Sequence, residues 1–321
     1  MSAFSLLVLI FIAALLAGTS AVLWSYFKSD MTAVRARLAG NSETVQTAFG
    51  TVEYAESGQG RPVLVIHGSG GGFDQALEMA GQLASFGYRL VAPSRFGYLR
   101  SDFPDHASPE LQADAFAALL DKLNLQRVMV LGGSAGALSA MQFAIRHPDC
   151  CQALVLLVPA AFAPDRKPNE SAAEGPIATA LVHLVLRSDF IFWLGITIIP
   201  GTMTKMLLAT EPSVIEAAGA EEKTRARRIL RHILPVSDRA EGLLLDTRTA
   251  GAPPRYDLER ITCPVLAVSA NDDLYGTAAA AAYTAAQVPN GRLVLYPTGG
   301  HLLAGNSEDV WREIASFLGR F

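Results

Sequence analysis

The sequence predicts an α/β fold: a mostly parallel sheet with flanking helices, a helical lid insertion and an N-terminal transmembrane helix. From about residue 45 to 158, short apolar runs alternate with amphipathic stretches, which is typical of βαβ units. Residues 159–255 hold helical stretches without a clear strand, and the strand pattern then returns. We therefore divide the chain into a membrane anchor (1–27), a linker (28–50), a core (51–158 and 256–321) and a lid (159–255).

The composition is that of a folded protein with no bias toward nucleic acid. Hydrophobic residues make up 50% of the 321 residues, charged residues 17%, and the formal net charge is −4. This apolar fraction excludes intrinsic disorder. A near-neutral net charge lacks the excess of positive charge that is typical of proteins that bind nucleic acid. Three cysteines form no disulfide framework and fit a reducing compartment. No cluster with metal-ligand spacing and no phosphate-binding loop is present, so neither a metal nor a cofactor is expected.

Residues 2–24 carry no formal charge. As a helix they span about 34 Å, enough to cross the roughly 30 Å hydrocarbon core of a bilayer. Trp24 and Tyr26 follow at a position where interfacial aromatic residues are common. We therefore expect an uncleaved anchor, because a signal peptide normally has a charged start and a shorter apolar run. Cleavage near Ala21, which would give a secreted or periplasmic protein, is the alternative.

The charges that follow this segment predict its orientation. Lys28, Arg35 and Arg37 outnumber Asp30 within about 15 residues of the span, the range over which the positive-inside rule acts. The domain after the anchor should therefore face the cytoplasm.

The strands and helices of the core are predicted from local pattern. Residues 62–66, for example, form a continuous apolar run that ends in His67 and glycines, which fits a strand buried on both faces. The other predicted strands are 51–55, 89–92, 127–131, 153–158, 263–268 and 292–296, and the predicted helices are 75–86, 111–123, 135–146, 278–287 and 307–318.

The sequence G-G-S-A-G, residues 132–136, lies between a predicted buried strand and a predicted helix. Glycines two positions before and after the serine remove side chains that would clash in a tight strand-to-helix turn. Such a turn projects the hydroxyl of Ser134 at the carboxyl edge of the sheet, beside a helix N-terminus that favours negative charge. We therefore predict that Ser134 is a nucleophile; the structural alternative is a glycine-rich turn with an incidental serine.

A second glycine-rich segment, H-G-S-G-G-G over residues 67–72, follows the predicted strand 62–66. Its unshielded backbone N–H groups suit an anion-binding loop. We predict an oxyanion hole formed by the N–H groups of Ser69 and Ala135. We expect the ring of His67 to brace this loop by hydrogen bonding, because a better candidate for a general base exists.

That candidate is His301, which follows a glycine pair just after the predicted strand 292–296. From there a histidine can reach back over the sheet edge toward Ser134. A carboxylate after strand 263–268 could orient the imidazole, and both Asp272 and Asp273 are placed for this role. One of the two is expected to be a turn residue instead. For the remaining histidines, His106, His147, His183 and His232, a surface or packing role is predicted.

The order of nucleophile, acid and base along the chain resembles the α/β-hydrolase fold superfamily, in its serine esterase-like, lidded form. The resemblance covers roughly residues 50–158 and 255–321, and the helical insertion falls where the family carries its lid. It implies that Pro264 begins the strand that leads to the acid. Counting from Pro264 gives Asp273, with Ala270 where the family usually has glycine, so Asp272 stays an alternative.

The resemblance implies a serine hydrolase that cleaves an ester-like bond of a small molecule through an acyl-enzyme, with an apolar acyl group bound under the lid. The H-G-S-G-G-G loop also resembles that of ring-cleavage-product hydrolases, so carbon–carbon bond hydrolysis is a second hypothesis. A non-catalytic, ligand-binding member of the fold is a third. The expected partners are thus a small-molecule substrate and, through the N-terminal helix, a membrane; no sequence feature sets an oligomeric state.

Overall fold

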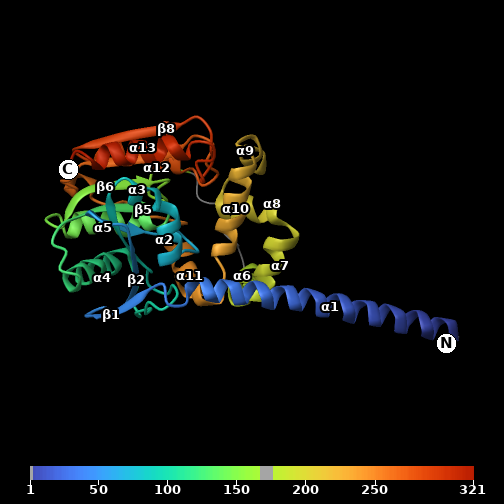
Figure 1. The fold of residues 1–321 in the computed structure, drawn as a ribbon. Helices are drawn as coiled ribbons and strands as arrows, with labels where there is room; N and C mark the ends of the chain where they lie inside the picture. The colour runs from blue at the N-terminus through green and yellow to red at the C-terminus, as the bar shows by residue number, and fades with distance from the viewer. Residues whose placement is uncertain (1–2, 167–175) are drawn as a thin grey trace. The chain divides into compact units, whose positions relative to one another are not determined.

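The computed structural model describes residues 3–166 and 176–321 (Figure 1). The predicted anchor and lid each include a few residues outside these ranges, 1–2 and 167–175. The chain divides into two compact units, Met1–Ala39 and Gly40–Phe321.

The first unit is built on one helix, α1 (Ala3–Leu38). Its segment Phe4–Leu38 is, in the described part of the chain, the one unbroken helix that is long and apolar enough to cross a bilayer. Large apolar side chains such as Phe4 and Phe11 are exposed. The helix continues to Leu38, so the predicted linker (28–50) is helical over its first half, and a strand occupies part of its second half.

In the described residues of the second unit, eight strands form one sheet in the order β1-β2-β4-β3-β5-β6-β7-β8. The pairs β1–β2 and β2–β4 are antiparallel and the remaining pairs are parallel, which confirms the predicted mostly parallel sheet. The strands are β1 (Glu43–Thr47), β2 (Gly50–Ser57), β3 (Arg61–Ile66), β4 (Tyr88–Pro93), β5 (Val128–Gly133), β6 (Cys151–Leu157), β7 (Val265–Ala270) and β8 (Gly291–Tyr296).

Helices cover both faces of this sheet. On one face, α4, α5 and α12 share a single apolar core with the strands, centred on residues such as Phe116 and Phe143. On the other face, α2, α3 and α13 contact β4 and β7 or one another. The ranges are α2 (Phe73–Ala80), α3 (Gln82–Ser85), α4 (Pro109–Lys122), α5 (Gly136–Arg146), α12 (Thr277–Gln287) and α13 (Ser307–Leu318).

The predicted helical insertion lies between β6 and β7, and Figure 1 shows its helices α6 to α10 grouped together beside the sheet. Arg187 and Asp189, which interrupt its most apolar stretch, form polar contacts within the insertion: Arg187 with Glu241, and Asp189 with Ser237. The helices are α6 (Pro176–Leu186), α7 (Asp189–Ile198), α8 (Pro200–Leu208), α9 (Pro212–Ala217), α10 (Ala220–His232) and α11 (Ala240–Thr249), with 3-10 turns at Ser237–Arg239 and Leu258–Arg260.

Two local differences from the sequence prediction have simple causes. The helix predicted over 75–86 is broken at Gly81 into α2 and α3. Strand β1 was not predicted because its sequence, E-T-V-Q-T, alternates polar with small residues and has only one strongly apolar member. It is an edge strand, and its pairing with β2 through the short turn after Thr47 compensates for that weak pattern.

Candidate active site

Ser134 stands in a strained turn between β5 and α5. Its φ is 50°, a left-handed conformation that non-glycine residues seldom adopt. The flanking glycines allow this turn because it is crowded: a Cβ at Gly132 would lie 2.6 Å from Ala140 Cβ, and one at Gly136 would lie 2.4 Å from the carbonyl of His67. The tight turn therefore places the half-buried hydroxyl of Ser134 at the carboxyl end of β5.

The structure brings His301 to this hydroxyl. His301 Nε2 lies 2.9 Å from Ser134 Oγ, and Nδ1 lies 2.7 Å from Asp273 Oδ2. With Nδ1 protonated, the imidazole donates to the carboxylate and leaves Nε2 free to accept the serine proton. The ring of Tyr275 packs edge-on against His301 at 5.1 Å, and its hydroxyl donates to the carbonyl of Met206 at the end of α8.

Asp273 is buried and fully hydrogen-bonded. Besides His301, its carboxylate accepts from the backbone N–H of Tyr275 at 2.8 Å and from the hydroxyl of Thr277, which also contacts Ser269. Burial alone would raise the pKa of Asp273, but the charge of His301 and these donors hold that pKa below its ordinary value. The group is therefore an anion where it meets the imidazole.

Asp272, the alternative acid, contacts a different part of the same loop. Its two oxygens accept from the backbone N–H groups of Gly299, at 3.2 Å, and Gly300, at 2.8 Å. It thus fixes the glycine pair that precedes His301, and the structure places Asp273, not Asp272, against the imidazole.

The two predicted oxyanion donors flank Ser134. The glycine loop comes close to the serine, since a Cβ at Gly68 would lie 3.1 Å from Ser134 Cβ. Within the described part of the chain, neither the N–H of Ser69 nor that of Ala135 donates to a protein acceptor. Both groups therefore remain available for a substrate oxygen.

His67 braces the glycine loop, as its position after β3 predicted. Its Nδ1 donates to the carbonyl of Gly68 at 2.7 Å, and its Nε2 accepts from the backbone N–H of Arg95 at 2.9 Å. Complete burial and the charge of Arg95 hold the pKa of His67 well below its ordinary value, so the ring is neutral. This neutral tautomer satisfies both ring nitrogens and leaves no role as a base.

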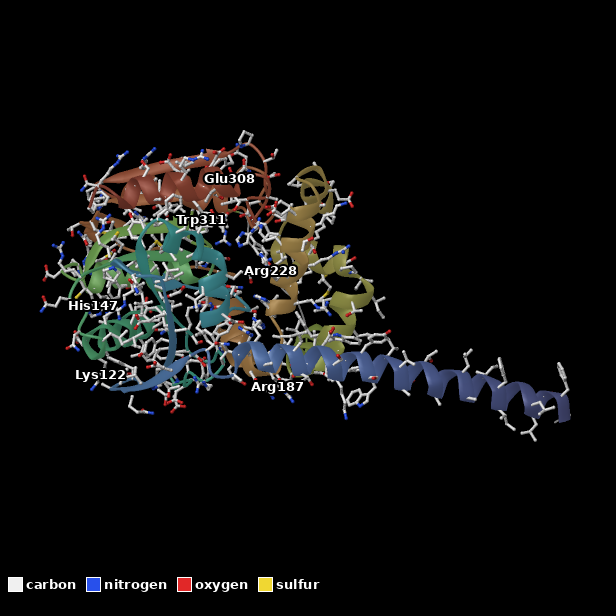
Figure 2. The ribbon with its side chains drawn as sticks, viewed as in Figure 1. Lys122, His147, Arg187, Arg228, Glu308 and Trp311 are labelled. Atoms are coloured by element: carbon white, nitrogen blue, oxygen red, sulfur yellow. The ribbon has the colours of Figure 1, made fainter. Side chains whose placement is uncertain are left out.

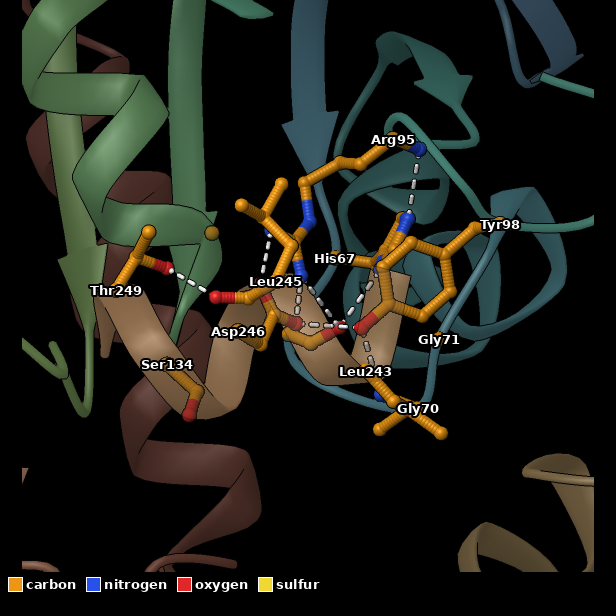
Figure 3. A network of polar contacts seen from close by, with 12 residues as sticks. His67, Gly70, Gly71, Arg95, Tyr98, Ser134, Leu243, Leu245, Asp246 and Thr249 are labelled. Carbon is orange, nitrogen blue, oxygen red and sulfur yellow. Dashed lines mark hydrogen bonds and ion pairs between the residues drawn. The ribbon is translucent and has the colours of Figure 1, made fainter. Parts of the chain in front are cut away.

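A buried charge network that the sequence did not predict supports the same loop (Figure 3). Asp246 of α11 binds Arg95 through two hydrogen bonds, of 2.8 and 2.5 Å, and accepts from the hydroxyl of Tyr98 at 2.5 Å. The Tyr98 hydroxyl in turn accepts from the N–H of Gly70, and Arg95 donates to the carbonyl of Gly68. Burial, then the charge of Asp246, raises the pKa of Tyr98 well above its ordinary value, so its hydroxyl stays a donor.

A second buried pair joins the insertion to this loop. Arg239, which is fully buried, pairs with Asp74 at 3.0 Å and donates to the carbonyl of Gly71. Arg239 and Asp246 both lie in the insertion, at least 148 residues along the chain from their partners. In the sequence, the only indication of these contacts was that Arg239 and Asp246 are charged residues in a helical, partly apolar segment.

Two of the other histidines form structural contacts. His147 (Figure 2) contacts Asp114 at 2.9 Å near the end of α5, and His232 pairs with Glu78 of α2. In the described part of the chain, no group of three His, Cys, Asp or Glu side chains is placed to hold a metal ion.

A small space of about 10 Å³ lies beside Ala135. Polar and apolar side chains both line it, and the apolar ones include Phe96 and Leu138 of the core and Leu245 of α11. A space of this size holds about one water molecule, so a larger group can enter only if lining side chains move.

The sheet, its flanking helices and the geometry around Ser134 are those of an α/β-hydrolase fold, and the comparison with families agrees. Residues 61–306, more than half of the chain, match the profile of the family described as alpha/beta hydrolase fold. The chain belongs to that family.

Curated relatives match a shorter segment. The chain is 30% identical over 113 residues to the 2-hydroxy-6-oxo-6-phenylhexa-2,4-dienoate hydrolase of Comamonas testosteroni, covering 34% of this chain and 40% of that protein. It is 35% identical over 115 residues to the 2-hydroxy-6-oxononadienedioate/2-hydroxy-6-oxononatrienedioate hydrolase of Paraburkholderia xenovorans. This match covers 33% of this chain and 39% of that protein. The matches thus span about two fifths of the length of these relatives.

Solved structures match over a longer range. An α/β hydrolase fold protein from Nakamurella multipartita is 28% identical with a TM-score of 0.64, over 86% of this chain and 98% of that one. A membrane phospholipase A, described as a bacterial virulence factor, is 22% identical with a TM-score of 0.65, and the match covers 99% of this chain and 98% of that chain. At such identity the second likeness concerns the fold alone.

Proposed function

We propose that this protein is a serine hydrolase that cleaves an ester-like bond of a small molecule through an acyl-enzyme. The observation that carries the proposal is the hydrogen-bonded series from Ser134 through His301 to Asp273. A serine within reach of a base that is itself oriented by a buried carboxylate is the arrangement needed for nucleophilic catalysis.

In the proposed mechanism, Ser134 Oγ attacks the carbonyl carbon while His301 Nε2 takes its proton. Asp273 holds the imidazole in the tautomer that leaves Nε2 free and stabilises the imidazolium that forms. The N–H groups of Ser69 and Ala135 stabilise the oxyanion, an effect worth about 3–4 kcal/mol per donor in a well-studied serine protease. His301 then protonates the leaving alcohol and later activates the water that hydrolyses the acyl-enzyme.

Carbon–carbon bond hydrolysis is the second candidate, because two curated relatives carry names of dienoate and dienedioate hydrolases. Such substrates are carboxylates and would gain from an unpaired cation. Two arginines that support the glycine loop are already neutralised: Arg95 pairs with Asp246, and Arg239 pairs with Asp74. These two ion pairs leave neither charge for a carboxylate and so favour an uncharged ester-like substrate at this loop.

We propose that the insertion acts as a lid over an apolar acyl site. Ile233, which follows α10, lies 3.2 Å from the position of a Cβ at Gly70, and Leu245 narrows the space beside Ala135. Apolar side chains of the insertion therefore stand next to the glycine loop, where an acyl chain would displace them and bury its own surface.

We expect hydrolysis of p-nitrophenyl esters to rise from acetate to medium-length acyl chains, because longer chains bury more apolar surface. The full chain in detergent micelles is assayed with this series and with a dienone substrate of the carbon–carbon hydrolases. A fluorophosphonate probe should label Ser134. A flat or acetate-favouring profile contradicts the apolar acyl site, faster cleavage of the dienone favours the second candidate, and absence of both labelling and turnover indicates a non-catalytic protein.

We further propose that α1 anchors the protein in a membrane with the hydrolase unit on the cytoplasmic side. The positive charges of this helix, Lys28, Arg35 and Arg37, lie toward its C-terminal end, and Asp30 only partly offsets them. The exposed apolar residues that precede them are those that lipid would cover.

Cell fractionation tests this topology. We expect full-length protein in the membrane pellet, protected from protease added to intact cells and digested once the cells are broken. Replacing Lys28, Arg35 and Arg37 together by Glu should weaken or invert this protection, whereas replacing Lys122, Arg127 and Lys223 by Glu, far along the chain, should leave it unchanged. A shortened, soluble protein would indicate a cleaved signal peptide, and digestion in intact cells would indicate the opposite orientation.

A further inference from the structure

Two cysteines meet at the edge of the sheet opposite the candidate active site. Cys151 is the first residue of β6, and Cys263 stands two residues before the start of β7. Their sulfur atoms are 3.6 Å apart although 112 residues separate them along the chain. Because β6 and β7 are parallel, these are the amino ends of the strands, whereas Ser134 and Asp273 follow the carboxyl ends of β5 and β7.

An open cavity gives solvent molecules a route to the pair. Its volume is about 580 Å³, large enough for a small organic molecule. Both cysteines line it, although each is more than nine-tenths buried. The other lining residues are Arg127, Pro148, Asp149, Gln152, Thr262 and Pro264.

The pKa values of the three thiols of the chain are shifted in different directions. The hydrogen-bonded contact between the two thiols lowers the pKa of Cys263, whereas the same contact and burial raise the pKa of Cys151. Burial, then the charges of Asp121 and Asp149, raises the pKa of Cys150. The thiolate is the attacking form in thiol–disulfide exchange, so Cys263 is the expected nucleophile of the three.

We propose that Cys151 and Cys263 form a thiol-modification site that reacts with a low-molecular-weight disulfide and closes into an intramolecular disulfide. Cys263 thiolate attacks one sulfur of the small disulfide, forms a mixed disulfide and releases one small thiol. Cys151 then loses its proton to solvent, attacks the sulfur of Cys263 and releases the second small thiol. The two protein thiols are oxidised and the small disulfide is reduced to two thiols, so atoms and electrons balance.

The geometry requires little rearrangement for the second step. A disulfide bond is about 2.0 Å long, so the two sulfur atoms must approach by roughly 1.5 Å. The bond would tie β6 to β7 and close a loop that contains the whole insertion. A cross-link over so long a loop restricts the unfolded chain, and we therefore expect it to raise the melting temperature.

The proposal is tested on the folded full chain in detergent micelles, incubated with glutathione disulfide, alkylated and mapped by mass spectrometry. We expect a Cys151–Cys263 cross-link. The Cys150→Ser variant should react at the same rate and makes the assignment unambiguous, because Cys150 and Cys151 are adjacent. Cys151→Ser should stop at glutathione bound to Cys263, and Cys263→Ser should react at least about tenfold more slowly.

Ester hydrolysis and thermal unfolding provide a second measurement. The oxidised chain should melt at a higher temperature than the reduced chain, revert with dithiothreitol, and keep its esterase rate because the site lies at the other edge of the sheet. The proposal is overturned if glutathione attaches chiefly to Cys150, if the cross-link forms only in urea, or if the cross-linked chain melts no higher. Each of these results concerns the thiols alone and leaves the proposed hydrolase activity to its own tests.

Discussion

Replacing Ser134 by Ala should abolish turnover of every ester that the protein cleaves. Its hydroxyl is the proposed nucleophile and lies 2.9 Å from His301 Nε2. In a well-studied serine protease, loss of the nucleophile costs roughly 10⁶-fold in kcat, and the rate that remains comes from the oxyanion hole and substrate binding. We expect a loss of at least roughly 10⁴-fold in kcat for p-nitrophenyl esters, together with loss of fluorophosphonate labelling.

The variant should fold normally, because alanine only removes a half-buried hydroxyl and keeps the same Cβ in the turn. Ser316→Ala is a matched control, since Ser316 is exposed on α13 far along the chain from the site. Circular dichroism and the melting temperature should be alike for wild type and both variants. A pure, folded Ser134→Ala protein that keeps a substantial fraction of wild-type kcat would exclude Ser134 as the nucleophile.

The sequence predicted the core because its strands are local features. Apolar runs that end in glycine-rich turns mark β3 and β5; the last four residues of β3 and all of β5 are buried. The residues proposed for chemistry follow the carboxyl ends of β5, β7 and β8, and parallel strands bring those ends to one edge. The sequence could therefore predict that Ser134, His301 and Asp273 lie close together, but not the distances between them.

Contacts made across long separations were not foreseeable. Asp246 binds Arg95 and Tyr98 because helix α11 returns to the glycine loop, and no local pattern in either segment indicates that partner. The approach of Cys151 to Cys263 likewise depends on the pairing of β6 with β7 across the insertion. Such contacts arise from tertiary packing, which the local pattern of apolar residues does not predict.

The insertion also supports the glycine loop, apart from its proposed role as a lid. Arg239 and Asp246 each hold the glycine loop that carries the proposed oxyanion donor Ser69, one through Gly71 and the other through Arg95 and Tyr98. Any movement of the insertion that admits substrate must keep these buried ion pairs or replace them, because an unpaired buried charge is costly. Movement confined to α6–α9, with α10, the 3-10 turn and α11 held in place, meets that requirement and also keeps the pairs of Arg228 and His232 with Glu78.

Asp273→Asn should lower kcat by about 10⁴-fold, the loss seen when the orienting carboxylate of a well-studied triad becomes an amide. The surroundings explain why an amide fails here. One oxygen of Asp273 faces the donors His301 and Thr277, and the other faces the N–H of Tyr275. Whichever way the amide turns, its NH₂ group meets a donor, and the imidazole loses the anion that holds its tautomer.

Asp272→Asn is the matched comparison, one residue away and with the same change of charge. In the described part of the site, Asp272 contacts the backbone of Gly299 and Gly300, and an asparagine oxygen still accepts from one of them. We expect kcat to fall less than about tenfold and the free energy of unfolding to fall by about 1 kcal/mol. Steady-state kinetics on a p-nitrophenyl ester and thermal unfolding measure both variants. If Asp272→Asn loses far more activity than Asp273→Asn, the orienting carboxylate is Asp272, and the imidazole must turn from the position seen here when it works.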